Sequence, residues 1–351
     1  MRIAQVAPLV ESVPPKGYGG SERVVSWLTE ELVRQGHDVT LFASADSRTS
    51  AELVPCSKQA LRFDPEAEVA VTYHVAMLEE VRQRADEFDA IHFHIDYLHY
   101  PIFRPHASRT LTTMHGRLDL PFLKPVFAKF PEMPLVSISY HQRTPFASAN
   151  WVGTVYHGLP RDLLPYCEAP AWDYLAFLGR ICPEKGVDRA IRIAKRIGMK
   201  LKIAAKIDKV DERYFEDEIR PLLADPLIEF VGEVGDADKR AFLGNAFAVL
   251  FPIDWPEPFG LVMIEAMACG APVLAFRRGS VPEVIDHGIS GLVVDDEEEA
   301  LAAVRRTSML DRHRVRQQFE KRFSVERMAS DYVALYQCGL RRASDSAASP
   351  A

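Results

Sequence analysis

Two glutamates, Glu257 and Glu265, stand on either side of the sequence Phe259-Gly260-Leu261, where a helix is predicted to begin. The prolines that flank Glu257 cannot lie inside a helix, and Gly260 frees the backbone. We therefore expect Glu257 on a loop and the helix start near Phe259 or Gly260. Glu265 then lies about one to two turns inside that helix.

The helix start between the two carboxylates indicates which ligand groups this stretch can bind. The N–H groups of Phe259, Gly260 and Leu261 would point out of a helix N-terminus that carries about half a positive charge, which favours phosphate. Carboxylates beside a phosphate are good acceptors for sugar and ribose hydroxyls, and a nucleotide-sugar carries one hydroxyl set on each side of its diphosphate. We predict that Glu257 binds the transferred sugar and Glu265 the ribose. The alternative is an ordinary helix with two solvated glutamates.

Two cations follow a predicted strand, 174–178, on a glycine-bounded loop that runs from Gly179 to Gly186. Arg180 can bind phosphate oxygens with its planar fork, and Lys185 can do so as a point charge. The pair is therefore predicted to clamp a diphosphate. A solvated basic loop is the alternative.

His115 follows a predicted strand, 110–114, and precedes Gly116. A histidine at the carboxyl end of a parallel strand stands where such sheets bind ligands. A histidine that is hydrogen-bonded within a turn is the other interpretation.

A glycine-rich loop, VPPKGYGGSE, joins a first strand, 2–7, to a predicted helix, 21–35, for which Ser21 is a plausible N-cap. Gly19 and Gly20 would allow backbone amides to approach an anion at that helix start. The spacing is not the G-x-G-x-x-G fingerprint, which disfavours a nicotinamide dehydrogenase. A flexible surface turn is the alternative.

His92 and His94 alternate on one predicted strand, and His99 follows it. No carboxylate or cysteine joins them at ligand spacing, so no metal site is predicted and the histidines are expected to line a strand end.

Composition narrows the classes of function. The 351 residues carry a net charge of −7, which gives a nucleic-acid partner no electrostatic support. The five cysteines are widely spaced, which favours free thiols and a cytoplasmic location. No apolar run is long enough to span a membrane. Peripheral contact with the inner membrane face stays open, chiefly because of the apolar and basic stretch 120–131.

Strands and helices alternate in two similar halves, which predicts two Rossmann-like, doubly wound parallel-sheet domains of the α/β class. We place an N-terminal domain at 1–165, a C-terminal domain at 166–320, a terminal helix at 321–340 and a disordered tail at 341–351. The segment 47–68 is expected to be loop.

The stretch PEPFGLVMIEAMACGAPVLAFRRGSVPEVIDHGISGLVV resembles the glutamate-seven-glutamate signature of retaining GT-B glycosyltransferases, the group that includes bacterial glycogen synthases, sucrose synthases and many mannosyl- and glucosyltransferases. The resemblance implies a GT-B fold in which the two domains face a central cleft and the terminal helix returns to the first domain. It also implies a metal-independent front-side mechanism, without a cofactor, in which Glu257 orients the sugar.

The same resemblance implies roles for the other candidates. His115 would contact the transferred sugar near the reacting carbon, and Arg180 and Lys185 would stabilise the leaving diphosphate. The glycine-containing loop would face the donor diphosphate and the acceptor, and backbone groups near Val234 would seat the nucleotide base.

We therefore expect an enzyme that moves a hexose from a nucleoside-diphosphate sugar to an acceptor hydroxyl with retention. UDP-glucose is expected as the donor on frequency alone, and lipid, polysaccharide and small-molecule acceptors stay open. The alternatives are a nucleotide-sugar epimerase of the same architecture and a non-catalytic nucleotide-sugar-binding protein.

Overall fold

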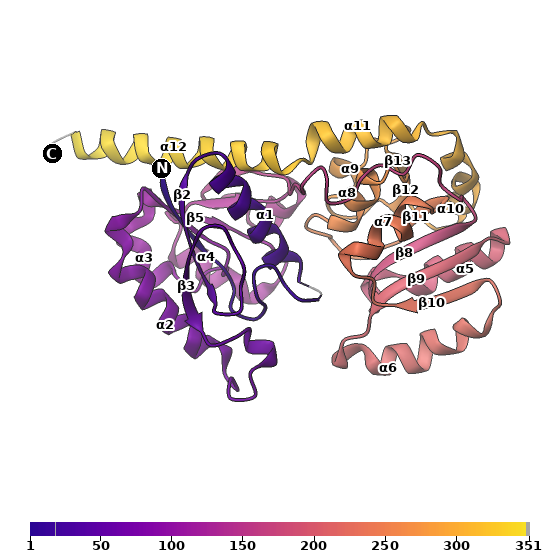
Figure 1. Ribbon diagram of the computed structural model, residues 1–351, viewed down its shortest axis with the longest axis horizontal. Helices are drawn as coiled ribbons and strands as arrows, with labels where there is room; N and C mark the ends of the chain where they lie inside the picture. Colours follow the sequence, from indigo (N-terminus) through magenta and orange to yellow (C-terminus); the bar gives the residue numbers. More distant parts are fainter. Residues whose placement is uncertain (18, 349–351) are drawn as a thin grey trace. The chain divides into compact units, whose positions relative to one another are not determined.

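The structure is a computed structural model that describes residues 1–17 and 19–348 (Figure 1). The chain forms two compact units. Unit 1 consists of Met1–Gly158 and the chain from Val325 onward, and unit 2 consists of Leu159–Ser324. The structure thus divides the chain after Gly158, where the sequence placed the division after residue 165.

Unit 1 is built on a parallel sheet that has seven strands among the described residues, in the order β3-β2-β1-β4-β5-β6-β7. The order runs outward from β1 in both directions, as doubly wound sheets do. The strands are β1 (Arg2–Val6), β2 (Asp38–Ser44), β3 (Glu52–Ser57), β4 (Ala90–Phe93), β5 (Thr110–Thr113), β6 (Leu135–Ser137) and β7 (Trp151–Thr154).

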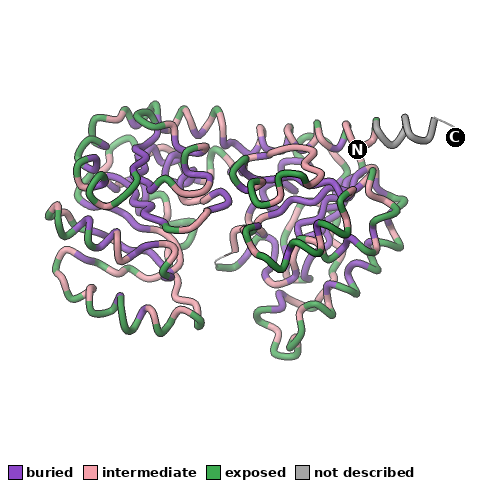
Figure 2. The backbone as a smooth tube through the Cα atoms, turned by 180° about the vertical axis from the view of Figure 1, so that it is seen from behind, coloured by how far each residue is buried: buried purple, intermediate pink, exposed green. Residues whose placement is uncertain are grey.

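The helices of unit 1 flank this sheet, and Figure 2 shows the buried strands between more exposed helices. They are α1 (Gly20–Arg34), α2 (Ala70–Gln83), α3 (Tyr100–Phe103), α4 (Lys124–Lys129) and α12 (Val325–Ala348). Apolar side chains from the strands and from α2 form the core on one face, among them Val6, Phe42, Leu78 and Phe93.

The C-terminal helix α12 is fixed to unit 1 by polar contacts. The Arg327 guanidinium donates to the carbonyl oxygens of Tyr156 and His157, at 2.6 and 3.2 Å. Tyr332 and Tyr336 turn their hydroxyls toward the sheet, where each has a hydrogen-bond partner.

Unit 2 repeats the design with a parallel sheet of six strands among the described residues, in the order β10-β9-β8-β11-β12-β13. The strands are β8 (Tyr174–Arg180), β9 (Lys200–Lys206), β10 (Ile228–Gly232), β11 (Ala248–Phe251), β12 (Val273–Phe276) and β13 (Gly291–Val294). The helices are α5 (Val187–Ile197), α6 (Glu212–Tyr214), α7 (Asp236–Gly244), α8 (Leu261–Ala268), α9 (Val281–Val284), α10 (Glu297–Ala303) and α11 (Arg312–Arg322).

Two local predictions are wrong. The segment 47–68 contains the edge strand β3, which carries Pro55 and has no fully buried residue, so that its pattern does not mark it as a strand. Helix α1 begins at Gly20 with Gly19 as its N-cap and without a side-chain cap, so Ser21 lies inside the helix.

The end of the chain also differs from the sequence prediction. Helix α12 begins at Val325 and continues to Ala348, where the predicted helix covered 321–340. The predicted disordered tail is thus helical in its first part, and its last residues, 349–351, lie outside the described residues. No helix in the described part of the chain has the length and apolar character that crossing a membrane requires.

Candidate active site

The Glu257 loop connects β11 to α8, and two glycines determine its course. Gly260 adopts a left-handed φ of 80° as the N-cap of α8. Gly279, with φ of 55°, lies against the loop so closely that a Cβ atom there would be 2.3 Å from the Glu257 carbonyl oxygen. Only glycine fits such a position.

Ser280 ties the same loop to the segment after β12. Its backbone N–H donates to the carbonyl oxygen of Glu257, at 2.9 Å, and its hydroxyl donates to that of Phe259, also at 2.9 Å. Ser280 is fully buried. The backbone on both sides of Pro258 is therefore held in one conformation before α8 begins at Leu261.

Lys185 and Glu257 form an ion pair in unit 2. The Lys185 Nζ lies 2.5 Å from the Glu257 Oε2, and the side chains are only 17% and 9% exposed. The Trp255 indole N–H donates to the same oxygen at 3.0 Å, and its ring lies 4.6 Å from the Lys185 Nζ. The two residues predicted to bind phosphate and sugar are thus each other's partners.

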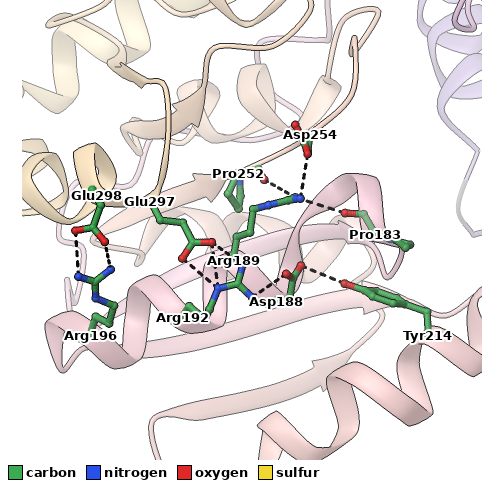
Figure 3. A network of polar contacts seen from close by, with 10 residues as sticks. All are labelled: Pro183, Asp188, Arg189, Arg192, Arg196, Tyr214, Pro252, Asp254, Glu297 and Glu298. Atoms are coloured by element: carbon green, nitrogen blue, oxygen red, sulfur yellow. Dashed lines mark hydrogen bonds and ion pairs between the residues drawn. The ribbon is translucent and has the colours of Figure 1, made fainter.

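The Lys185 loop is itself fastened to the segment that precedes Glu257. A Cβ atom at Gly186 would be 2.2 Å from the Pro252 carbonyl oxygen, and the Asp254 N–H donates to the Glu184 carbonyl oxygen at 2.8 Å. Figure 3 shows Arg189, whose guanidinium reaches the Pro252 carbonyl at 3.4 Å and the Asp254 carboxylate at 3.2 Å.

Arg180 ends β8 and is about one-third exposed. Its guanidinium nitrogens lie 3.3 Å from Glu184, 3.6 Å from Asp208 and 3.4 Å from Asp211. A phosphate group that binds Arg180 must therefore displace carboxylates. The contacts are long for charge-assisted hydrogen bonds, so the guanidinium is not tightly bound to any one of them.

Glu265 forms the second buried ion pair of unit 2. Its Oε1 lies 2.6 Å from the Nζ of Lys239, and the side chains are 5% and 13% exposed. Lys239 lies in the first turn of α7 and follows Val234, which is half-buried on the loop between β10 and α7. Lys239 was not among the predicted site residues, although its place in the helix after the predicted base-binding loop was a usable signal.

The remaining candidates lie in unit 1. His115 follows β5, and the Gln142 side-chain amide donates to the carbonyl oxygens of its neighbours, Met114 at 2.9 Å and Gly116 at 2.8 Å. His94 Nδ1 lies 2.9 Å from His115 Nε2. Burial lowers the pKa of His115 to about 4, so the ring is neutral at pH 7.

Gly19 and Gly20 begin α1, as the sequence placed them near a helix start. A Cβ atom at Gly19 would be 2.8 Å from Pro15 and 3.1 Å from a carboxylate oxygen of Glu22. Burial raises the pKa of Glu22. The glycine is thus required for close packing of this loop.

His92, His94 and His99 are buried inside unit 1. They do not line an open strand end, because hydroxyl, amide and imidazole groups surround them. Within residues 1–17 and 19–348, no group of three histidine, cysteine or acidic side chains is arranged to hold a metal ion.

Two parallel-sheet units, each with its ligand-binding candidates after the carboxyl ends of strands, define a glycosyltransferase of the GT-B type. Residues 172–323 match the family described as Glycosyl transferases group 1, and residues 18–160 match Glycosyltransferase Family 4. The chain belongs to this group 1 superfamily of GT-B glycosyltransferases.

Curated relatives match over different lengths. A D-inositol 3-phosphate glycosyltransferase of Corynebacterium kroppenstedtii is 34% identical over 122 residues, which are 35% of this chain and 26% of that protein. The phosphatidyl-myo-inositol mannosyltransferase of Mycolicibacterium smegmatis is 26% identical over 341 residues, 86% of this chain and 83% of that one.

Solved structures share the fold over nearly the whole chain. A glycosyltransferase involved in avilamycin A biosynthesis superposes with a TM-score of 0.77 at 23% identity, covering 97% of this chain and 98% of that chain. HepE of Anabaena, in complex with UDP and glucose, superposes with a TM-score of 0.75 at 17% identity, covering 96% of this chain and 100% of that one.

Proposed function

We propose that this protein transfers a hexose from a nucleoside-diphosphate sugar to an acceptor hydroxyl, with retention at the anomeric carbon. The observation that carries the proposal is the pair of buried ion pairs beside the N-terminus of α8, Lys185–Glu257 and Lys239–Glu265. One pair lies on the loop before α8, and the other joins α7 to the middle of α8.

Buried ion pairs are poor devices for stability. Removing two charges from water costs several kcal/mol per ion, and apolar residues of similar volume often stabilise as well or better. A site that must bind phosphates and hydroxyls, by contrast, needs both kinds of charge. A diphosphate can take over the Lys185 ammonium while sugar and ribose hydroxyls donate to Glu257 and Glu265.

In the proposed reaction the bond between the anomeric carbon and the diphosphate oxygen breaks, and a bond from that carbon to the acceptor oxygen forms on the same face. The acceptor's proton passes to the leaving phosphate oxygen, so no separate base is required. Arg180, Lys185 and the amides from Phe259 to Leu261 would stabilise the negative charge that develops on the diphosphate.

For the remaining groups we propose further roles. Glu257 orients the sugar, Glu265 binds the ribose, and backbone groups near Val234 bind the base. His115 contacts the transferred sugar, and the amides beside Gly19 and Gly20 approach an anionic group of the substrate. No metal or cofactor is assigned to the reaction.

UDP-glucose is the donor to test first, because HepE, which has this fold, was solved with UDP and glucose. The two curated relatives act on inositol compounds according to their names, so a polyol or its lipid derivative is the first acceptor to test. Peripheral membrane contact and a cytoplasmic location remain part of the proposal.

A thermal-shift titration with UDP, GDP, ADP and CMP tests the donor class. At about a hundred times its Kd, the preferred nucleotide adds about 2.7 kcal/mol to the stability of the fold that binds it, which raises Tm by on the order of 5 °C. Glu265→Gln should reduce this shift. Glu297→Gln, which alters the exposed ion pair between α10 and Arg192 of α5, should retain it.

Product analysis then tests the transfer. Incubation of UDP-glucose with an inositol acceptor should give a glycoside with the donor's anomeric configuration, read by NMR coupling constants. Conversion of the sugar without an acceptor would indicate an epimerase, and nucleotide binding without turnover of any donor would indicate a binding protein. An inverted product would refute retention.

A further inference from the structure

A line of buried hydrogen bonds runs through unit 1 from the C-terminal helix α12 to His115. The Gln5 side-chain amide donates to the Tyr336 hydroxyl at 3.1 Å, and its oxygen lies 2.8 Å from His94 Nε2. His94 Nδ1 then lies 2.9 Å from His115 Nε2. The line therefore joins α12, β1, the end of β4 and the loop after β5.

The residues between the ends of this line are removed from water. Gln5 is 0% exposed, and His94 and Tyr336 are each 3% exposed. A buried amide or imidazole costs free energy unless it is hydrogen-bonded, and leucine or phenylalanine would fill these interior positions without that cost. The polar side chains thus call for an explanation other than packing.

The chemistry of neutral imidazole makes the line directional. A neutral ring has one N–H donor and one nitrogen acceptor. Because the Gln5 oxygen accepts, His94 Nε2 must carry the proton and His94 Nδ1 must accept. His115 Nε2 must then be the donor, and the proton-free nitrogen of His115 is Nδ1. Burial lowers the pKa of both histidines, which keeps them neutral at pH 7.

We infer that Gln5, His94 and Tyr336 are positioning residues that hold His115 in its Nε2–H tautomer, with Nδ1 as the acceptor for a substrate hydroxyl. Among the described residues, His115 Nδ1 is buried and has no hydrogen-bond partner. An acceptor of this kind suits a sugar hydroxyl. This inference rests on the proposed contact between His115 and the sugar.

Tyr336 supplies the acceptor that the Gln5 amide N–H has in this orientation. Its hydroxyl accepts from Gln5 and donates its one proton to His92 Nδ1, at 2.7 Å. His92 Nε2 then donates to the Thr113 hydroxyl at 2.7 Å, which lies 2.9 Å from the Tyr332 hydroxyl. Without Tyr336, the Gln5 side-chain amide can rotate so that its N–H donates to His94 Nε2. The hydrogen bond between His94 and His115 would then reverse its direction.

Tyr332 offers a matched control. It lies one turn before Tyr336 on α12 and is likewise buried, but its hydroxyl contacts Thr113 and is not on the line from Gln5 to His115. Tyr332→Phe and Tyr336→Phe remove the same atom from similar surroundings. Only Tyr336→Phe should change the tautomer of His115.

Nitrogen-15 NMR of the imidazoles tests the inference on the full chain without substrate. In the wild type, His115 should show a proton-free Nδ1 and a protonated Nε2, with assignment by the signals that His115→Asn removes. In Tyr336→Phe both shifts should move toward the average of the two tautomers, and in Tyr332→Phe they should stay. A protonated Nδ1 of His115 in the wild type would overturn the inference. This result can be obtained without any substitution of Gln5, His94 or Tyr336.

Kinetics supply the second readout. Tyr336→Phe should lower kcat by about ten- to a hundredfold, the loss that follows when a supporting group behind an active-site histidine is removed in metal enzymes, with little change in the donor KM. Tyr332→Phe should lower kcat much less. Equal losses in both variants, or identical NMR spectra, would assign Tyr336 a merely structural role.

The two proposals fail in distinguishable ways. If no donor is turned over but the wild-type tautomer is Nε2–H, the proposed transfer is wrong and the positioning of His115 stands. If transfer occurs and the tautomer is the opposite one, only the inference about positioning is wrong.

Discussion

At the scale of single residues, the Lys185–Glu257 pair combines a binding role with a stability cost. Each charge neutralises the other in a largely buried position, and the indole N–H of Trp255 satisfies one carboxylate oxygen. When a diphosphate takes over the ammonium, Glu257 is freed for sugar hydroxyls. The pair can thus exchange internal contacts for contacts with the donor.

A double-variant series on this pair separates stability from activity. Lys185→Met leaves the Glu257 carboxylate buried without its cation and should cost about 3–5 kcal/mol in urea unfolding. Adding Glu257→Gln removes the charge and should restore most of that loss, while transferase activity stays low. Recovery of activity in the double variant would show that neither charge acts on the donor.

Arg180 gives a second test at this scale. Arg180→Ala should lower kcat by about a hundredfold, as loss of one donor to a developing oxyanion does, because phosphate charge would lose its planar partner. Arg192→Ala, which removes an ion-paired arginine on α5 (Figure 3), is the matched control and should leave kcat unchanged. Unchanged turnover in Arg180→Ala would exclude its role.

Residue types with a strong chemical signal could be predicted from the sequence, but their partners could not. The carboxylates, Arg180 and Lys185 stand beside prolines and glycines that mark loops at strand ends. Lys239 gave a weaker signal, because only the folded chain brings it to Glu265. Gln5 and Tyr336 lie far from His115 in sequence, so nothing local connects them with it.

At the scale of elements, the loop before α8 depends on the segment after β12. A Cβ atom added at Gly279 would lie 2.3 Å from the Glu257 carbonyl oxygen. Gly288 also has a positive φ, but a Cβ atom added there would have no neighbour within 4 Å. The two glycines therefore differ in packing and not in the sign of φ. This difference can be measured.

Gly279→Ala should destabilise unit 2 by about 3 kcal/mol or more, from left-handed strain together with overpacking. Gly288→Ala should cost about 1–2 kcal/mol, from strain alone. Urea unfolding measures both, and the nucleotide-induced rise in Tm should shrink only for Gly279→Ala. Equal costs would mean that the Glu257 loop does not need this support.

The strands and helices differ in how well their own sequence predicts them. Buried parallel strands give apolar runs of recognisable length, so most of both sheets could be predicted. The edge strand β3 has half-buried and exposed residues and a proline, so its pairing with β2 depends on its neighbour and not on its own pattern. The N-cap of α1 depends on how the glycine loop packs on Pro15, which the sequence does not specify.

At the scale of the whole molecule, unit 1 is unusual in burying a group of neutral histidines. Burial lowers the pKa of His92, His94, His99 and His157 well below the ordinary value, and that of His115 to about 4. Below pH 6.5 the unfolded chain takes up protons that the folded unit does not. The stability of unit 1 is therefore fully present above pH 6.5 and decreases as pH falls toward 4.

Two carboxyl groups act in the opposite sense. Loss of hydration in the folded unit raises the pKa of Glu22 and of Asp96, so the folded unit binds their protons more readily than the unfolded chain does. Their contribution increases as pH falls and partly offsets that of the histidines. A test of the histidine effect must therefore compare variants, so that the carboxyl contribution cancels.

His99→Gln and Thr112→Val provide that comparison. His99 Nε2 bonds to the Thr112 hydroxyl at 3.0 Å, and both residues are fully buried. His99→Gln removes one titrating group and should reduce the slope of unfolding free energy between pH 6.5 and 4 by about 1.4 kcal/mol per pH unit. Thr112→Val removes the hydrogen bond without a titrating group, so it should lower stability equally at every pH. If His99→Gln keeps the wild-type slope, His99 takes up its proton in the folded unit, and burial does not hold this histidine neutral.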